Sequence, residues 1–181
     1  GNYLFTLEEK EEFVQSEPQS EKWFREWYGA REFINRKPRY CLWLGDCPPN
    51  ILREMPKSLE RVKAVRDYRL ASKSPGTRKL AETPTRFHVE NIPDSDYLLI
   101  PRVSSEYRRY IPIGFMSKDM LTSDSVLIMP EAKVYHFAIL SSNVHMSWVR
   151  AVAGRLESRY RYSARVVYNN FPWVKLTEEQ K

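Results

Sequence analysis

The pattern of hydrophobic and polar positions predicts helices mainly in the first half of the chain. Thr6 and Glu9 have the spacing of a capping box that opens a helix. A later segment has apolar residues at helical spacing on one side and Arg66, Arg69 and Lys73 on the other. The predicted helical segments are Thr6–Gln15, Ser20–Tyr28, Pro48–Met55 and Pro56–Ser72, followed by a basic loop at Lys73–Lys79.

Short apolar runs bounded by turn-forming residues predict strands, most of them in the second half. Turn-forming residues at Asn91–Asp96 and Ser117–Asp124 indicate antiparallel connections. The order of elements predicts an α+β fold, in which N-terminal helices pack on a curved mixed or antiparallel sheet, with a late helix and a cationic loop. The predicted strands are Tyr3–Phe5, Arg39–Leu44, Arg86–Glu90, Tyr97–Pro101, Tyr110–Phe115, Val126–Met129 and Tyr135–Ile139.

The late helix leads into a stretch rich in arginine and tyrosine. Ser142 or Asn143 is suited to begin this helix, and Gly154 is suited to end it. The chain then reads RLESRYRYSAR, and a returning strand is expected at Ala164–Tyr168. Such a row of planar hydrogen-bonding side chains suits contact with a polyanion whose edges are read as well as bound. The arginines of this region are Arg150, Arg155, Arg159, Arg161 and Arg165.

Composition favours one globular domain with an acidic partner. The formal net charge is +6, and hydrophobic residues make up 42% of the chain. Two cysteines, Cys41 and Cys47, are too few for a disulfide framework or a zinc site, which makes a reducing cytoplasm the expected location. No apolar run approaches the length of a membrane span. The chain begins without methionine, which indicates a piece of a larger polypeptide.

No motif for catalysis is present in the sequence. His88, His136 and His145 are dispersed and lack metal-ligand spacing, so a structural role is expected for each. The chain has no nucleophile elbow, no Walker A loop and no GxGxxG motif. We therefore expect no catalytic residue, no metal and no cofactor in this fragment.

Four stretches, taken in order, resemble the target recognition domain of MmeI-like restriction–modification enzymes. Those enzymes are single-chain DNA adenine methyltransferases, usually fused to a nuclease. The resemblance implies that this chain selects a sequence on double-stranded DNA, while an upstream domain of the same polypeptide uses S-adenosylmethionine. It also implies one recognition domain, with a helical lead-in at 1–30, a recognition core at 31–175 and a tail at 176–181. The four stretches are Arg39–Asp46, Ser104–Phe115, Phe137–Ser163 and Val167–Trp173.

The resemblance also assigns the positions where base choice varies within the family. They fall on Glu157, Arg159 and Arg161, and around Asp124 and Ser125. The chemistry agrees, because arginine can donate to guanine O6 and N7 and glutamate can accept from cytosine N4. In the alternative interpretation, Glu157 and Arg159 pair with each other or with neighbouring arginines.

Other cations are suited to phosphate contacts. These are Arg66, Arg69, Lys73, Arg108, Arg109 and Lys118. For the first three, a solvated helix surface is an equal alternative. Two other functions stay open for the whole chain: a generic module for RNA or single strands that stacks bases on tyrosines, and a protein–protein interaction domain.

Overall fold

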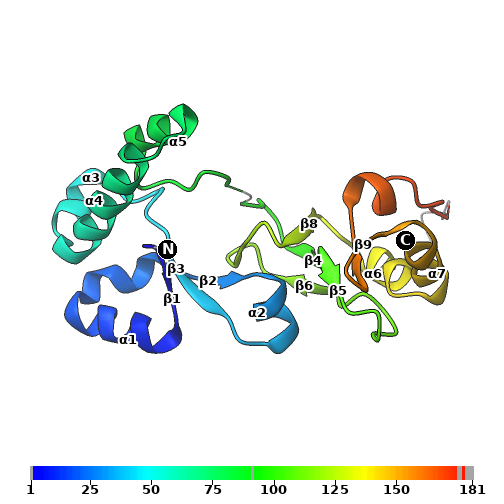
Figure 1. Ribbon diagram of the computed structural model, residues 1–181. Helices are drawn as coiled ribbons and strands as arrows, with labels where there is room; N and C mark the ends of the chain where they lie inside the picture. Colours follow the sequence, from blue (N-terminus) through cyan, green and yellow to red (C-terminus); the bar gives the residue numbers. More distant parts are fainter. Residues whose placement is uncertain (1, 91, 175–176, 178–181) are drawn as a thin grey trace. The chain divides into compact units, whose positions relative to one another are not determined.

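The computed structural model describes residues 2–90, 92–174 and 177, and its elements form two compact units. Unit 1 comprises Gly1–Trp27 and Pro38–Asn91, and unit 2 comprises Tyr28–Lys37 and Ile92–Lys181. Each unit has its own hydrophobic core, and Figure 1 shows their elements.

Unit 1 combines a small antiparallel sheet with helices. The central strand β3 (Arg39–Leu42) pairs with β1 (Leu4–Phe5) on one side and with β2 (Phe24–Tyr28) on the other. The core joins aromatic residues of the sheet and α1 to aliphatic residues of α3 and α4. The helices are α1 (Leu7–Ser16), η1 (Pro18–Trp23), α3 (Pro49–Arg53), α4 (Pro56–Leu70), α5 (Pro75–Lys79) and η2 (Leu80–Glu82).

Unit 2 is built around strand β4 (Tyr97–Pro101), which is buried along its whole length. Its two sides face different apolar clusters, because successive strand residues point to opposite faces. Leu98 and Ile100 pack with α6, α7 and η3, whereas Tyr97 and Leu99 lie in a second cluster with Val126. The helices of unit 2 are α2 (Ala30–Asn35), α6 (Val134–Leu140), α7 (Asn143–Val152) and the π-helix η3 (Ala164–Tyr168).

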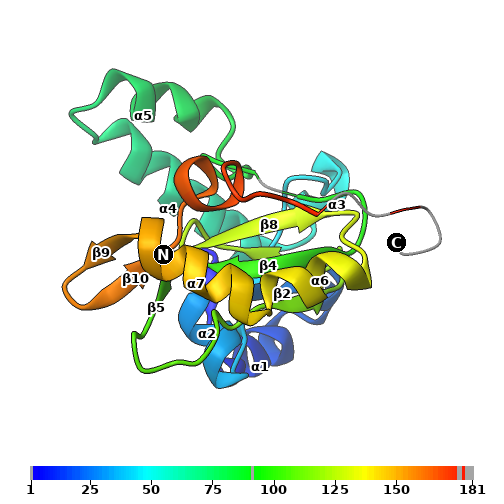
Figure 2. The ribbon, with the colours of Figure 1, turned by 90° about the vertical axis from the view of Figure 1, so that its right-hand side faces the viewer.

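Two three-stranded antiparallel sheets organise unit 2, and Figure 2 shows α7 beside their strands. The first has the order β6-β4-β8, and the second has the order β5-β10-β9. Their strands are β5 (Val103–Ser104), β6 (Gly114–Met116), β8 (Val126–Pro130), β9 (Gly154–Leu156) and β10 (Arg159–Arg161), and the short β7 (Leu121–Thr122) lies between β6 and β8 in sequence.

The predicted α+β class is confirmed, and so are several elements. Thr6 and Glu9 form the predicted capping box, in which the Thr6 backbone N–H donates to the Glu9 carboxylate at 2.8 Å. Ser142 is the N-cap of α7, and its hydroxyl accepts from the His145 backbone N–H. The predicted boundaries of lead-in, core and tail stay a prediction, and residues 176 and 178–181 of the tail lie outside the described residues.

Three segment predictions in unit 1 are wrong. The Ser20–Tyr28 segment is not one helix, because η1 gives way to β2, which pairs with β3 from Phe24 onward. No strand forms at Arg86–Glu90, where Phe87 packs its ring on Trp43. The predicted loop at Lys73–Lys79 contains α5, whose N-cap Ser74 accepts from the Thr77 backbone N–H.

Three strand predictions in unit 2 are wrong. The Tyr135–Ile139 segment is helical within α6, and Ala164–Tyr168 is the π-helix η3. The Tyr110–Phe115 segment reaches strand geometry only at β6, because the preceding residues form a loop.

Candidate nucleic-acid interface

A short hairpin carries three of the predicted base-reading residues. Strands β9 and β10 pair with Leu156 opposite Arg159, which leaves Glu157 and Ser158 as the turn. Glu157 has a φ of 57°, in the left-handed region that a tight hairpin turn requires. The turn therefore places Glu157 at the tip, with Arg159 and Arg161 following along β10.

Strand β10 places its arginines on the exposed face and its tyrosine on the buried face. Arg159 and Arg161 are exposed, whereas Tyr160 between them is only 5% exposed and belongs to the core. Tyr162 is also buried, and its hydroxyl lies 3.0 Å from His145 Nε2. Because alternate strand residues face opposite sides, the tyrosines anchor the hairpin and the arginines face solvent.

The side chains at the hairpin tip form a small charged cluster. Arg159 Nη2 donates to Glu157 Oε2 at 2.6 Å, and the two side chains are 45% and 76% exposed. Arg155 lies over the Tyr160 ring at 3.9 Å and donates from Nη1 to the Ser158 carbonyl. The alternative in which Glu157 pairs with Arg159 therefore describes this structure.

The other predicted base-reading pair lies in the turn before β8. Asp124 and Ser125 are exposed, but the Ser125 hydroxyl accepts from the Ala30 backbone N–H at 2.9 Å. Backbone hydrogen bonds then link this turn to the hairpin, since Arg102 N donates to Ser125 O and Tyr162 N donates to Arg102 O. Unit 2 thus brings the turn and the hairpin together through Arg102, an exposed residue that the sequence reasoning missed.

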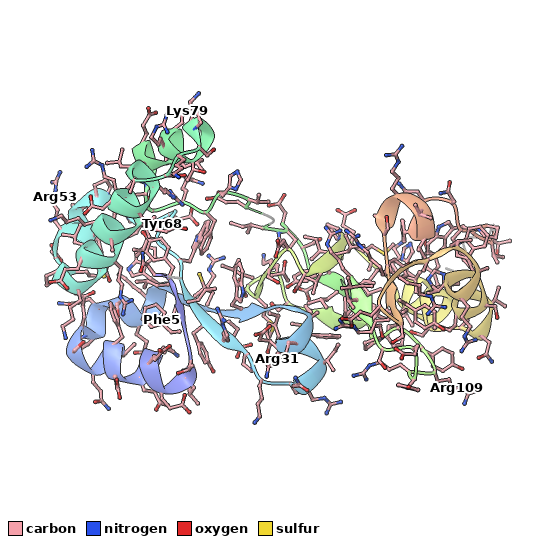
Figure 3. The ribbon with its side chains drawn as sticks, in the orientation of Figure 1. Phe5, Arg31, Arg53, Tyr68, Lys79 and Arg109 are labelled. Atoms are coloured by element: carbon pink, nitrogen blue, oxygen red, sulfur yellow. The ribbon has the colours of Figure 1, made fainter. Side chains whose placement is uncertain are left out.

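Three predicted phosphate-contacting residues lie on surface loops of unit 2. Arg108 and Arg109 are exposed in the loop after β5, and Arg109 lies 5.2 Å from the centre of the Tyr110 ring. Figure 3 labels Arg109 on this part of the molecule. Lys118 is exposed in the turn after β6, where its backbone N–H donates to Asp96. All three ammonium or guanidinium groups are available to an anion.

The three predicted contacts in unit 1 do not share one environment. Arg66 and Lys73 are exposed. Arg69 is only 9% exposed, and its guanidinium donates to the carbonyls of Leu80, Thr83 and Arg86. The assignment of Arg69 to phosphate is therefore wrong for this structure, because its donors already hold the segment after α5 against α4.

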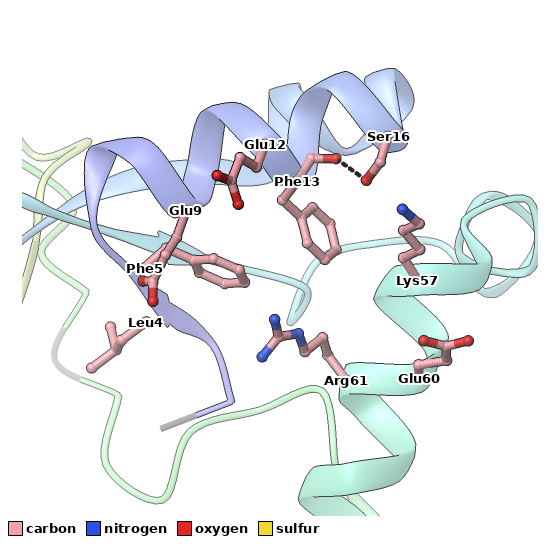
Figure 4. A pocket seen from close by; sticks show the side chains of 9 residues that line it. All are labelled: Leu4, Phe5, Glu9, Glu12, Phe13, Ser16, Lys57, Glu60 and Arg61. Carbon is pink, nitrogen blue, oxygen red and sulfur yellow. Dashed lines mark hydrogen bonds between the residues drawn. The ribbon is translucent and has the colours of Figure 1, made fainter.

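One cavity in unit 1 has more carboxylates than cationic groups in its lining, which does not suit a phosphate. It has a volume of about 630 Å³, and the carboxylates of Glu9, Glu12 and Glu60 line it (Figure 4). Arg61 points toward the Phe5 and Phe13 rings, with its guanidinium 5.0 Å from the centre of the first. We therefore do not count this cavity as part of the nucleic-acid interface.

Within residues 2–90, 92–174 and 177, no group of three or more His, Cys, Asp or Glu side chains could hold a metal ion. The same residues include no helix long and apolar enough to cross a membrane. His145 is buried, and burial lowers its pKa to about 4. Its ring packs edge-on against Phe171, which supports the predicted structural role.

Comparisons with known proteins agree with this arrangement. A family model described as "MmeI, target recognition domain" matches residues 1–175. The chain is 38% identical over 181 residues to DNA methyltransferase A of Bacillus subtilis (strain 168), a match that covers all of this chain and 21% of that relative. The solved structure of the type IIL restriction–modification enzyme MmeI in complex with DNA matches with 49% identity and a TM-score of 0.94, over 99% of this chain and 24% of that protein. The chain therefore belongs to the family of MmeI target recognition domains.

Proposed function

We propose that this chain reads a sequence on double-stranded DNA with the β9–β10 hairpin and thereby positions the site for adenine N6 methylation. A separate S-adenosylmethionine-dependent domain of a longer polypeptide would perform the transfer. The observation that carries the proposal is the hairpin tip, where Glu157 and Arg159 are exposed side by side on a turn anchored by buried Tyr160. An acceptor and a donor are thus held together at the end of a narrow projection.

The two side chains have the chemistry to address one G·C pair. The Arg159 guanidinium can donate to guanine O6 and N7, and the Glu157 carboxylate can accept from cytosine N4. Their mutual ion pair does not prevent this, because exposed ion pairs contribute only about 0.2–1 kcal/mol. A matched base contact contributes about 1–3 kcal/mol of discrimination, so replacing the Glu157–Arg159 ion pair by contacts to bases is favourable.

Exposed cations outside the hairpin would set the register of the chain on the duplex. Arg108, Arg109 and Lys118 are exposed in unit 2, and Arg66 and Lys73 are exposed in unit 1. Contacts to phosphate position a protein on DNA and carry no base information by themselves. We assign these five residues to phosphate and reserve base reading for Glu157, Arg159, Arg161 and the Asp124–Ser125 turn.

The alternative function is a module for RNA or single strands that stacks bases on tyrosine. Stacking requires exposed ring faces. Tyr160 and Tyr162 are buried in the core, so the hairpin presents arginine and glutamate instead. A stacking module would prefer single strands and tolerate one base-pair change, whereas a duplex reader would lose affinity sharply on that change.

A charge-reversing double variant of the full-length enzyme tests the proposal. Glu157→Lys with Arg159→Asp should redirect the modified sequence at one base pair, because lysine can donate to guanine and aspartate can accept from cytosine. Each single variant should be less active than the double, since it leaves one unmatched charge against a base edge. Sequencing of the modified sites for wild type, both singles and the double gives the result.

A matched pair elsewhere in unit 2 provides the control. Glu131 also has a positive φ, of 56°, and Lys133 lies two positions after it with opposite charge. Glu131→Lys with Lys133→Asp should leave the modified sequence unchanged. If the hairpin double variant still modifies the original sequence, the hairpin does not read bases.

A further inference from the structure

The two faces of the β9–β10 hairpin differ in chemistry. Residues that lie directly opposite each other in an antiparallel pair share a face, and successive residues of a strand alternate between faces. One face carries Arg155 and Tyr160, whose guanidinium and ring lie 3.9 Å apart. The other face, which we name the Leu156 face, carries Gly154, Leu156, Arg159 and Arg161.

Leu156 is an exposed apolar side chain among the proposed base-reading residues. It is 46% exposed and lies directly opposite Arg159, which is also exposed. Because Gly154 has no side chain, the Leu156 face presents one apolar side chain and two guanidinium groups. A lone exposed leucine is common on protein surfaces, so its neighbours decide what it can do here.

The neighbours of Leu156 are the two side chains assigned to one G·C pair. Glu157 follows it directly in the chain, and Arg159 is its partner across the hairpin. In the major groove, the cytosine of such a pair presents its N4 amino group, and the apolar C5–H group lies beside that amino group. A side chain that cannot form hydrogen bonds suits this C5 edge, since it leaves N4 to the Glu157 carboxylate.

We propose that Leu156 contacts the C5 edge of the cytosine whose N4 is read by Glu157, and that it thereby excludes a methyl group at C5. The inference rests on the proposed function of the hairpin. The contact buries part of the exposed leucine, which is favourable for an apolar surface. It also disfavours thymine at this position, because thymine carries a methyl group at C5. Leu156 is thus a further specificity-determining residue.

The test places 5-methylcytosine at that position of the cognate duplex and measures the rate of methyl transfer by the full-length enzyme. The position is given by the base pair that the charge-reversing double variant redirects. For wild type, the rate should fall on the order of tenfold relative to the unmodified duplex, the usual effect of one extra methyl-sized group in a filled site. For Leu156→Ala, the two rates should be nearly equal, because the smaller side chain leaves room for the methyl group.

A purely structural role of Leu156 predicts a different result. If Leu156 only supports the stem of Arg159, Leu156→Ala should weaken discrimination among unmodified base pairs and leave the effect of the 5-methyl group unchanged. That result would overturn the proposal, and so would a wild-type rate that is insensitive to the 5-methyl group. Leu156→Val, which is smaller by one methylene, should show an intermediate effect of the 5-methyl group. It decides the question if Leu156→Ala proves unstable, since a loss equal to that of wild type would contradict the contact.

Leu7→Ala is the matched control, because Leu7 at the start of α1 is 45% exposed, nearly as much as Leu156. It should retain the wild-type sensitivity to the 5-methyl group. If Leu7→Ala loses this sensitivity as Leu156→Ala does, the effect is a general one and the proposal fails. If reversal of Glu157 and Arg159 leaves the modified sequence unchanged, the proposed function fails. If the reversal redirects the sequence but the effect of the 5-methyl group does not depend on Leu156, only the present inference fails.

Discussion

Two buried charged side chains in unit 1 are satisfied by groups distant in sequence. Glu17 is 3% exposed and accepts from the backbone N–H groups of Lys57 and Ser58 at the start of α4. Arg69 donates to three carbonyls near the end of the same helix. Neither role is visible in the sequence, because spacing along a helix does not reveal which partner arrives from another segment.

Replacing Glu17 should destabilise the chain. Glu17→Ala removes the carboxylate that accepts from two N–H groups in the first turn of α4, and it leaves the buried Ser58 hydroxyl without its 2.5 Å partner. Loss of a cap and of a buried hydrogen bond together should lower the free energy of unfolding by about 3 kcal/mol. Urea denaturation measures the change. Glu21→Ala, at an exposed position of η1, is the control and should change the free energy by less than about 0.5 kcal/mol.

Stability should fall in mildly acidic solution because His145 resists protonation in the folded state. Burial lowers its pKa from 6.5 to about 4, so below pH 6.5 the unfolded chain binds the extra proton first. The free energy of unfolding should fall as the pH is lowered from 6.5 to 4, by at most about 3 kcal/mol. The free energy of unfolding, measured across this pH range, should therefore depend more steeply on pH in wild type than in the His145→Gln variant.

The exposed His88 supplies the comparison for that experiment. His88→Gln should retain the pH dependence of wild type. A His145→Gln variant with an unchanged pH dependence would contradict the assignment to His145.

At the scale of elements, the sequence predicted those whose signals are local. The capping box at Thr6 and the serine N-cap of α7 lie next to the helices that they begin, and both were recognised. The short apolar run of α6 was mistaken for a strand, since brief runs of this kind fit either structure. The β-branched residues of η3 likewise favoured a strand, but Val167 is fully buried and its carbonyl accepts from Trp148 Nε1. Tertiary packing thus decided the two cases.

At the hairpin, too, the sequence predicted some features, whereas others depend on tertiary structure. The sequence identified Glu157, Arg159 and Arg161 through a resemblance, and the tyrosines between them suggested stacking. Only the pairing with β5 shows that β10 turns Tyr160 inward. Arg102 was missed as a neighbour of the hairpin, because its proximity follows from the pairing of β5 with β10 and not from sequence spacing.

Arg66 on α4 and Lys73 just after the helix should contact phosphate, whereas Arg69 should not. Arg66→Ala and Lys73→Ala should each lower the slope of log affinity against log salt by about one unit, for every duplex sequence. Arg69→Ala should leave the slope unchanged and lower stability, because its donors bind carbonyls. Binding to duplexes over a series of salt concentrations measures the slopes.

Lys57→Ala is the matched control on the same helix. Lys57 lies nine positions before Arg66, which at about 100° per residue places it on the opposite side, next to the acidic cavity of Figure 4. Its removal should not change the slope. If the slope of log affinity against log salt is the same for Arg66→Ala and Lys57→Ala, Arg66 is only solvent-exposed and makes no phosphate contact.

At the scale of the whole molecule, this chain corresponds to less than a quarter of each relative reported above. It spans 21% of DNA methyltransferase A and 24% of the MmeI chain. The exposed cations proposed for phosphate come from both units, and a net charge of +6 favours DNA generally. Under the proposed function, affinity for a duplex would be distributed over many residues, whereas base discrimination would be concentrated at the hairpin.

This distribution predicts that the 181-residue chain alone binds duplex DNA weakly and transfers no methyl group. Its sequence has no cofactor-binding glycine motif, and the transfer is assigned to another domain. Incubation of the chain with labelled S-adenosylmethionine and duplex DNA should therefore give label in DNA only at background level. The full-length enzyme, assayed in parallel on the same duplex, should label it. Incorporation above background by the chain alone would place catalysis within these residues and contradict the division of labour proposed for the enzyme.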